Sequence, residues 1–235
     1  VLGGITIKGG TLGTSGSGVI QAVNSSGNFL DGTTIAGTLD LTGIANSRQR
    51  LINTNTLSGA INVANGGILS LDSGYSAGNA VALNGSGVIN LNDAGAWLAI
   101  ESAGSTTLAS TVTVRGQGKI GQAAYYSGNN TLTNNGRISA DVAGGTLTLM
   151  QPAYNGSVVN NGVLDARGGG TLAISTNVDN SGGQISAQNA SNTTYYFGAS
   201  NSTGGLLGTV RGRLGFGFDR WLIYATGGFA YGNAY

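Results

Sequence analysis

Apolar residues recur along the chain in a short pattern that begins with glycine. The pattern is a glycine, any residue, an isoleucine or leucine, any residue, and then usually a small or aliphatic residue. It begins at Gly18, Gly37, Gly59, Gly87, Gly118, Gly136, Gly162 and Gly183, of which Gly118 heads the poorest match. These glycines lie about 24 residues apart on average, a length typical of one coil in a stacked-repeat protein. The pattern therefore predicts a repeat fold.

Within each repeat, the alternation of apolar and polar residues is typical of a short strand with one face turned inward. Most repeats carry a second apolar alternation, for example at Leu147 and Leu149, so each coil holds two predicted strands. Asparagine and glycine between the strands, as in NNG at 134–136, supply the positive φ that tight corners need. Stacked in parallel, such strands bury one continuous core. We predict an all-β fold in which residues 1–196 form a right-handed parallel β-solenoid (β-helix) of about eight to nine coils.

Two other folds also use short apolar segments. A helical fold is excluded because glycine and β-branched residues dominate and no long segment holds an apolar stripe at helical spacing. A β-sandwich contains short strands at regular intervals, but it does not require one sequence pattern to recur. The recurrence favours the solenoid.

Polar residues recur at the fourth position of the pattern, where side chains are predicted to point outward. They are Gln21, Asp40, Asn62, Asn90, Ser139, Asp165 and Ser186. In stacked register they form a polar ladder, whose amides and hydroxyls can hydrogen-bond along the solenoid axis. Either they only keep an outer face hydrated, or they form a weakly charged binding face for sugars or host surfaces.

The amino-acid composition limits the kinds of catalytic and metal site that the chain can form. The chain has 235 residues with 44 glycines, no cysteine and no histidine, and only 8% of its residues are charged. Disulfides, thiolate zinc sites and catalytic groups based on cysteine or histidine are therefore excluded. A net charge of +1 without predicted basic clusters argues against nucleic acid as a partner. No motif for a phosphate, a metal or another cofactor is present, so none is predicted.

Few side chains could support catalysis. Asp40 and Asp165 share the outer face, but five coils, roughly 24 Å, separate them, which is too far for a carboxylate pair. Asp93 and Glu101 lie in one long insertion and could meet, but no basic residue lies near them in sequence. Arg48 and Arg50 are expected on a surface loop. The pair Tyr125–Tyr126 is expected to pack over a corner or, alternatively, to stack on sugar rings.

The last part of the chain, residues 206–235, has a different pattern. Two long alternating segments flank Asp219–Arg220, and each exceeds the length that crosses a bilayer as a tilted strand. The predicted membrane-facing residues of this β-hairpin are Val210, Leu214, Phe216, Phe218, Trp221, Ile223, Phe229 and Tyr231. On the first strand, Arg211 and Arg213 lie on the opposite face. The stretch 197–205 is predicted to be a loop that forms the seam between the two parts.

Two families resemble parts of this sequence. The stretches LTNNGRISADVAGGTLTL (132–149), VNNGVLDARGGGTLAIS (159–175) and VDNSGGQISAQN (178–189) resemble coils of bacterial autotransporter passengers and large surface exoproteins. The segment GTVRGRLGFGFDRWLIYATGGFAYGN (208–233) resembles one hairpin of the small eight-stranded outer-membrane β-barrel proteins of alphaproteobacteria. This second resemblance implies that Arg211 and Arg213 face the barrel lumen. Two strands cannot close such a barrel.

These observations lead to a main hypothesis and two alternatives. The main hypothesis is a non-enzymatic, structural or adhesive solenoid on a Gram-negative cell surface, or outside the cell, tied to an outer-membrane barrel element. Ile5, Thr6 and Ile7 at a strand edge suggest homo-oligomers or end-to-end filaments. A carbohydrate or a host surface is the expected ligand. The alternatives are a polysaccharide lyase or hydrolase on the same scaffold, and a porin-like membrane protein with a large solenoid loop.

Overall fold

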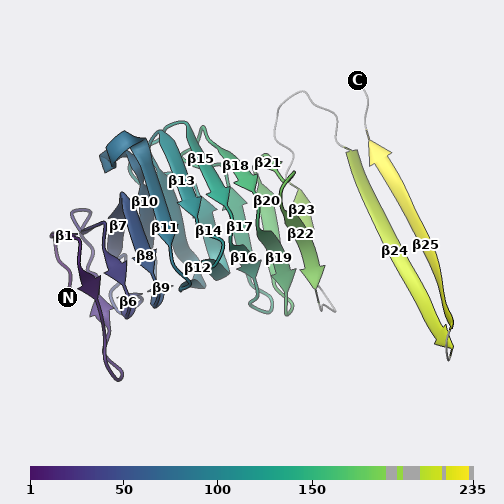
Figure 1. The fold of residues 1–235 in the computed structure, drawn as a ribbon, viewed down its shortest axis with the longest axis horizontal. Coiled ribbons are helices and arrows are strands. Elements are labelled where there is room, and N and C mark those ends of the chain that lie inside the picture. The colour runs from purple at the N-terminus through teal and green to yellow at the C-terminus, as the bar shows by residue number, and fades with distance from the viewer. Residues whose placement is uncertain (189–194, 198–206, 219–220, 233–235) are drawn as a thin grey trace. The chain divides into compact units, whose positions relative to one another are not determined.

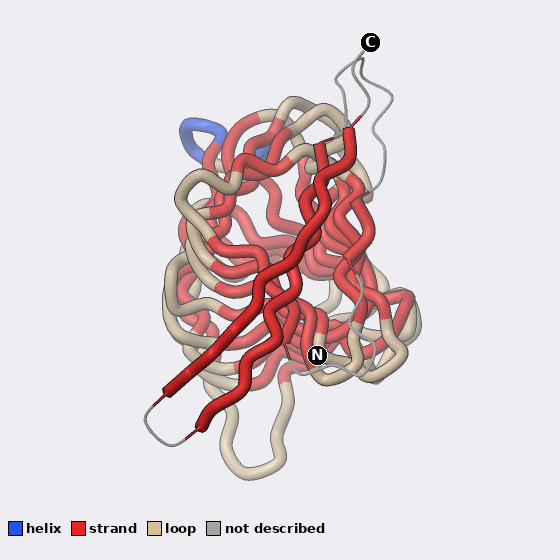
Figure 2. Tube along the Cα trace, turned by 90° about the vertical axis from the view of Figure 1, so that its right-hand side faces the viewer, coloured by secondary structure: helices blue, strands red, loops and turns tan. Residues whose placement is uncertain are grey.

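The computed structural model describes residues 1–188, 195–197, 207–218 and 221–232, with side chains described for 1–188. Residues 1–188 and 195–197 form a parallel β-solenoid of about seven turns, somewhat fewer than the eight to nine predicted. Strands of successive turns lie side by side in Figure 1, and Figure 2 shows the turns superimposed. The all-β solenoid prediction is confirmed.

Each turn contributes strands to three parallel stacks, one more than the two strands per coil predicted from the sequence. The first stack contains β1 (Thr6–Lys8), β4 (Phe29–Asp31), β7 (Arg48–Ile52), β10 (Ile68–Asp72), the second halves of β12 (Val88–Glu101) and β14 (Thr113–Gly121), β17 (Thr146–Met150), β20 (Thr171–Ser175) and β23 (Tyr195–Phe197). The second contains β2 (Thr11–Leu12), β5 (Thr34–Ile35), β8 (Thr54–Leu57), β11 (Ala80–Asn84), β13 (Gly104–Leu108), β15 (Asn130–Asn134), β18 (Ser157–Asn160) and β21 (Val178–Asp179). The third contains β3 (Ile20–Gln21), β6 (Thr38–Leu41), β9 (Ala60–Val63), the first halves of β12 and β14, β16 (Arg137–Ala140), β19 (Val163–Arg167) and β22 (Gln184–Gln188).

The core runs along the axis between the stacks. In the third stack, an isoleucine, a leucine or, in one turn, a valine points inward at the same register position. Leu39, Ile61, Ile89, Val114, Ile138 and Leu164 stack in register, and their side chains are fully buried. Because neighbouring turns share this one apolar interior, each turn is stabilised mainly by the turns on either side.

The register corrects one of the eight predicted repeat starts. Thr113 pairs with Val88 on one side and with Arg137 on the other, so Val112 and not Gly118 stands at the head of this turn. Gly118 lies in the first stack, opposite Leu147. Because valine stands where the other repeats have glycine, the sequence pattern does not reveal this repeat. The Val112 side chain is buried in the common core.

The recurring glycine has a steric cause. An ideal Cβ on Gly162 would come closer than 3.0 Å to the carbonyl oxygen of Gly136 one turn below, and the same contact recurs between Gly59 and Gly37. These carbonyls accept backbone hydrogen bonds from the next turn, as in Val163 N–H to Gly136 O at 2.8 Å. Glycine therefore lets successive backbones approach closely at this corner.

Asparagines at the corner before the third stack form a buried hydrogen-bonded column. Asn134 Nδ2 donates to Asn160 Oδ1 at 2.7 Å, and Asn160 Nδ2 donates to Asn180 Oδ1 at 2.6 Å. Asn134 and Asn160 are fully buried. The sequence indicated a turn here, and the structure adds that the side chains tie consecutive turns together.

Helical structure in residues 1–188 is limited to two short 3₁₀ helices, η1 (Ser73–Tyr75) and η2 (Ala77–Asn79), between β10 and β11. No helix among the described residues is long and apolar enough to cross a membrane.

Contacts within the chain define two units, Val1–Ala199 and Ser200–Tyr235. In the second unit, β24 (Leu207–Phe218) and β25 (Trp221–Gly232) are antiparallel strands of 12 residues each, with Phe218 opposite Trp221. The predicted seam at 197–205 lies outside the described residues, except Phe197 in β23. Also outside them are the side chains of the predicted membrane-facing set (Val210, Leu214, Phe216, Phe218, Trp221, Ile223, Phe229 and Tyr231) and of Arg211 and Arg213.

Candidate functional site

The predicted polar ladder is continuous on the outer face of the third stack. Consecutive turns place Gln21, Asp40, Asn62, Asn90, Arg115, Ser139, Asp165 and Ser186 directly beside one another. The sequence analysis missed Arg115 because its turn begins with Val112 and not with glycine. Asn90 Nδ2 donates to Asn62 Oδ1 at 2.9 Å, which is the axial amide contact expected of such a ladder.

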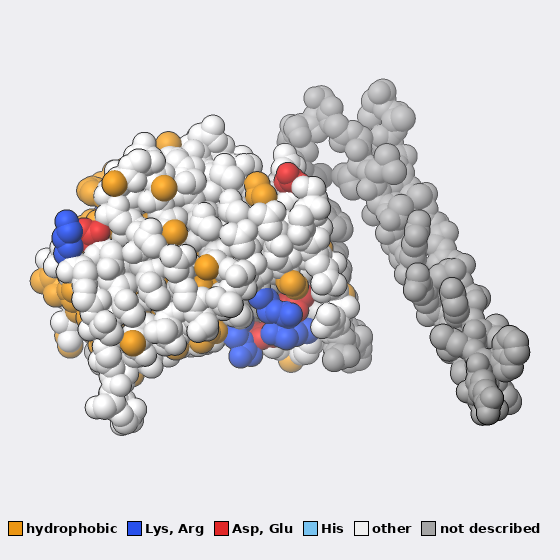
Figure 3. Space-filling model, viewed as in Figure 1, with side chains coloured by type: hydrophobic (Ala, Val, Ile, Leu, Met, Phe, Trp, Pro, Cys, Tyr) orange, Lys and Arg blue, Asp and Glu red, His pale blue; other side chains and the backbone are white. Residues whose placement is uncertain are grey.

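The half of the outer face toward the C-terminal end of the solenoid carries more charge than the weakly charged face that was predicted. Arg137 Nη1 lies 2.5 Å from Asp165 Oδ2, and Arg115 Nη2 lies 2.7 Å from Asp141 Oδ2. Arg167 Nε donates to Ser139 Oγ at 3.0 Å. On the face drawn in Figure 3, the largest gathering of Lys and Arg side chains lies near β16 and β19.

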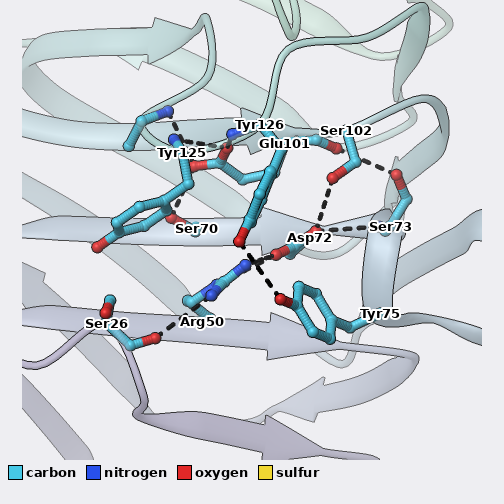
Figure 4. A network of polar contacts seen from close by, with 12 residues as sticks. Ser26, Arg50, Ser70, Asp72, Ser73, Tyr75, Glu101, Ser102, Tyr125 and Tyr126 are labelled. Carbon is cyan, nitrogen blue, oxygen red and sulfur yellow. Dashed lines mark hydrogen bonds and ion pairs between the residues drawn. The ribbon is translucent and has the colours of Figure 1, made fainter.

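A second polar cluster centres on Arg50 of β7, which the sequence analysis placed on a surface loop. Arg50 is instead 4% exposed, and its guanidinium donates to the fully buried carboxylate of Asp72 through both Nε and Nη2. Its Nη1 donates to the carbonyl of Ser26 at 3.3 Å. Arg50 and Asp72 come from the neighbouring strands β7 and β10, and the hydroxyls of Tyr75 and Tyr126 meet beside the pair (Figure 4).

Aromatic rings surround the Arg50 guanidinium. Its Cζ lies 4.6 Å from the ring centroid of Phe29, 4.8 Å from Tyr75, 4.9 Å from Tyr125 and 5.5 Å from Tyr126. Such cation–π contacts gain strength where water is excluded. Tyr75 and Tyr126 are about half exposed, with their hydroxyl oxygens 3.4 Å apart. The expectation that Tyr125 and Tyr126 pack over a corner agrees with these contacts.

Glu101 anchors the loop that carries these tyrosines. Its fully buried carboxylate accepts backbone N–H donors from Ala124, Tyr125 and Tyr126 at 2.9 to 3.1 Å and a hydroxyl from Ser70. Glu101 and Asp72 therefore hold the loop and Arg50 in place, and both are engaged inside the protein. The cluster joins residues from five turns, those of β4, β7, β10, β12 and β14, into one polar unit.

The tyrosines of this cluster predict a loss of stability at high pH. Burial raises the pKa of Tyr125 above its ordinary value of about 10, and the hydrogen bond with Tyr75 raises the pKa of Tyr126 in the same direction. The folded state then favours the neutral phenol, so this contribution is full below pH 10 and is lost as the pH rises above it. The free energy of unfolding, measured with urea, should fall less between pH 9 and pH 11 for Tyr125→Phe than for the wild type.

The control for this measurement is Tyr154→Phe, which removes a phenol that is 48% exposed. It should leave the difference between the two pH values unchanged. A pH dependence that is equal in all three proteins would contradict the assignment to Tyr125.

The carboxylates considered for catalysis do not form a pair. Asp93, in the interior of β12, accepts the backbone N–H of Asn65 at 2.6 Å through Oδ2, whereas Glu101, the last residue of β12, binds the tyrosine loop. Asp40 and Asp165 lie five ladder positions apart, as the sequence indicated. Within the part of the chain that the structure describes, no three acidic residues are grouped as metal ligands would be.

Self-association through the first strand stays a prediction. Ile5 is 44% exposed, and β1 pairs with β4 along one edge.

Comparison of the chain with family models, with curated proteins and with solved structures gives no match.

Proposed function

We propose that this chain is a non-enzymatic surface protein whose solenoid acts as a structural and adhesive rod. The observation that carries the proposal is the unbroken register of the third stack from Gln21 to Ser186, with one dry core inside and one polar ladder outside. Such stacking gives a rod whose long outer faces can contact a carbohydrate or a host surface. A binding role requires no reactive group. Because Asp40, Ser139 and Asp165 of the ladder are buried, ligand contact would fall to exposed side chains of this face such as Arg115.

The environments of the acidic residues also favour binding over catalysis. A lyase or hydrolase needs a carboxylate or another base that can reach the substrate. Asp72, Glu101 and Asp165 are fully buried and are held by arginine or by backbone N–H donors. These groups are better suited to holding loops and neighbouring turns in place than to abstracting a proton.

The place of action proposed is the outside of a Gram-negative cell, with residues 206–235 joining an outer-membrane barrel. Support comes from the resemblance of segment 208–233 to one hairpin of such barrels and from the coil resemblance to autotransporter passengers. The antiparallel strands β24 and β25 each have 12 residues, and 9 to 11 suffice for a tilted transmembrane strand. Further strands would have to come from the same or another chain.

Surface exposure can be tested in the native cell with an epitope inserted at Gly144. This glycine is exposed and no atom lies within 4 Å of the position of its Cβ, so the turn should accept an insertion. Antibody should label intact cells expressing the full protein, and external protease should remove the label. Deleting residues 206–235 should release the epitope from the outer-membrane fraction.

A periplasmic protein with the same epitope serves as the control and should be labelled only after permeabilisation. If the solenoid epitope behaves in the same way, the surface location is wrong. If the deletion variant stays in the outer-membrane fraction, the hairpin is not the anchor.

A further inference from the structure

We propose that the charged end of the outer ladder is a binding site for a linear anionic polysaccharide bearing sulfate or carboxylate groups. We call it the arginine patch, formed by Arg115, Arg137 and Arg167 together with Asp141 and Asp165. The inference deepens the proposed adhesive function, on which it rests, by naming the ligand class. It rests on how deeply the five side chains are buried: the two aspartates lie inside and the three arginines face solvent.

In the patch, the acids lie beneath the bases. The side chain of Asp165 is 0% exposed and that of Asp141 is 7% exposed. The guanidinium-bearing side chains above them are 50% exposed for Arg115, 34% for Arg137 and 38% for Arg167. Although two of the three positive charges are balanced by carboxylates, solvent meets mainly the basic groups. The surface therefore has positive polarity.

The arginines retain hydrogen-bond donors for a ligand. A guanidinium has five N–H donors. Arg137 makes one side-chain hydrogen bond, to Asp165, and Arg167 makes one, to Ser139. The carboxylates also hold the guanidinium groups in place, which lowers the entropy lost when an anion binds. An arginine that is held in place and still has free N–H donors can make paired hydrogen bonds with a carboxylate or sulfate.

The arginines lie on three successive turns and are offset from one another along the strands. Arg115, Arg137 and Arg167 come from β14, β16 and β19, which are consecutive strands of the third stack. Arg137 pairs with Thr113 and Val163, whereas Arg115 pairs with Ser139 and Arg167 with Gln188, so the three side chains stand at different positions along the strands. They span neighbouring strands that lie about 4.8 Å apart and form a compact patch. A linear polymer with repeated anionic groups can cross this patch and contact more than one guanidinium group. Gln184 and Gln188 continue the same outer face on β22 and offer amides to sugar hydroxyls.

Nucleic acid fits the patch less well than a polysaccharide. Three arginines and two aspartates leave a net charge of +1, whereas phosphate-backbone binding depends on several uncompensated basic residues. None of the five residues that form the patch is aromatic, so the patch itself has no ring on which a base could stack. The patch itself offers guanidinium, amide and hydroxyl groups, which match an acidic sugar chain.

The test is calorimetric titration of the purified chain with dextran sulfate, polygalacturonate, neutral dextran and duplex DNA. We expect dextran sulfate, polygalacturonate or both to bind, with affinity that falls as salt is raised, and neutral dextran not to bind. The variant Arg115→Gln/Arg167→Gln should bind the anionic polymer more weakly by at least about tenfold. Tighter binding of dextran sulfate would identify sulfate as the recognised group, and tighter binding of polygalacturonate would identify carboxylate.

Two control variants separate the patch from net charge and from folding. Lys119→Gln removes a positive charge from the first stack, where Lys119 lies 4.4 Å from the Trp97 ring, and should bind as the wild type does. Arg137→Gln/Asp165→Asn removes a charge pair without changing net charge, and far-UV circular dichroism checks that it folds. It should weaken binding, because one surface guanidinium is lost.

The proposal is overturned if Lys119→Gln weakens binding as much as Arg115→Gln/Arg167→Gln does, or if no anionic polysaccharide binds. Duplex DNA binding as tightly as the best polysaccharide would overturn the assignment of the ligand class. These outcomes are measured on the purified chain, so they are independent of the labelling of intact cells that tests the surface location.

Discussion

Replacing Gly162 by alanine is expected to destabilise the solenoid by about 3 kcal/mol, at the upper end of overpacking costs. The added Cβ would lie within 3.0 Å of the carbonyl oxygen of Gly136 and of backbone atoms of Asn135. Backbone atoms cannot rotate away as a flexible side chain can. The two turns must separate, which stretches the 2.8 Å hydrogen bond from Val163 N–H to Gly136 O. Urea unfolding followed by far-UV circular dichroism measures the loss.

Gly13→Ala is the matched control. Gly13 is exposed, its φ is not positive, and no atom lies within 4 Å of the position of its Cβ. The urea midpoint of Gly13→Ala should differ little from that of the wild type, because surface substitutions usually alter stability by no more than about 0.5 kcal/mol. Equal destabilisation by both substitutions would contradict the contact between turns as the cause of the recurring glycine, because Gly→Ala without a clash lowers the entropy of the unfolded chain and does not destabilise the fold.

Replacing Arg50 by methionine should cost about 3–5 kcal/mol, the range measured when one partner of a buried ion pair is removed. Asp72 would remain fully buried, with only Gly74 N–H and Ser102 Oγ as donors to its carboxylate. The four aromatic rings would also lose their common cation–π partner. The measurement is the urea midpoint, together with hydrogen exchange of the amides of β7 and β10.

Two further variants define the cause. Arg48→Met removes the neighbouring basic residue of β7, whose one side-chain hydrogen bond is a 3.5 Å contact to Gly66 O, and should have a small effect. Arg50→Met/Asp72→Asn removes the unpaired charge and should recover part of the lost stability. If the double variant is as unstable as Arg50→Met alone, lost packing and not the buried carboxylate explains the effect.

Much of the solenoid could be predicted because each repeat has a local sequence pattern that recurs along the chain. A glycine followed by alternating apolar and polar side chains indicates one short strand, and recurrence of that strand indicates stacking. The outer ladder followed from the same pattern at seven of its eight positions. The turn of Val112 was missed because valine is an ordinary core residue. Most second-stack strands were missed because many are short and rich in threonine, serine and asparagine.

The charged sites could not be predicted in this way. Arg50 contacts Asp72, Phe29 and the loop at Tyr125–Tyr126, which come from turns widely separated in sequence. The loops between strands differ in length, so nothing in the sequence says which side chains cover which strand. In the arginine patch, the bases lie outside and the acids beneath, an arrangement that depends on diagonal contacts such as Arg137 to Asp165.

The amino-acid pattern alone established that the chain forms short strands, which residues of each strand point inward, and which polar residues share an outer face. This was possible because the side-chain direction in a strand depends on local alternation. Three-dimensional stacking established which turn begins with a residue other than glycine, how deeply each charge is buried, and which charges meet. These properties depend on contacts between residues one or more turns apart, and such contacts are set by the register of the whole solenoid.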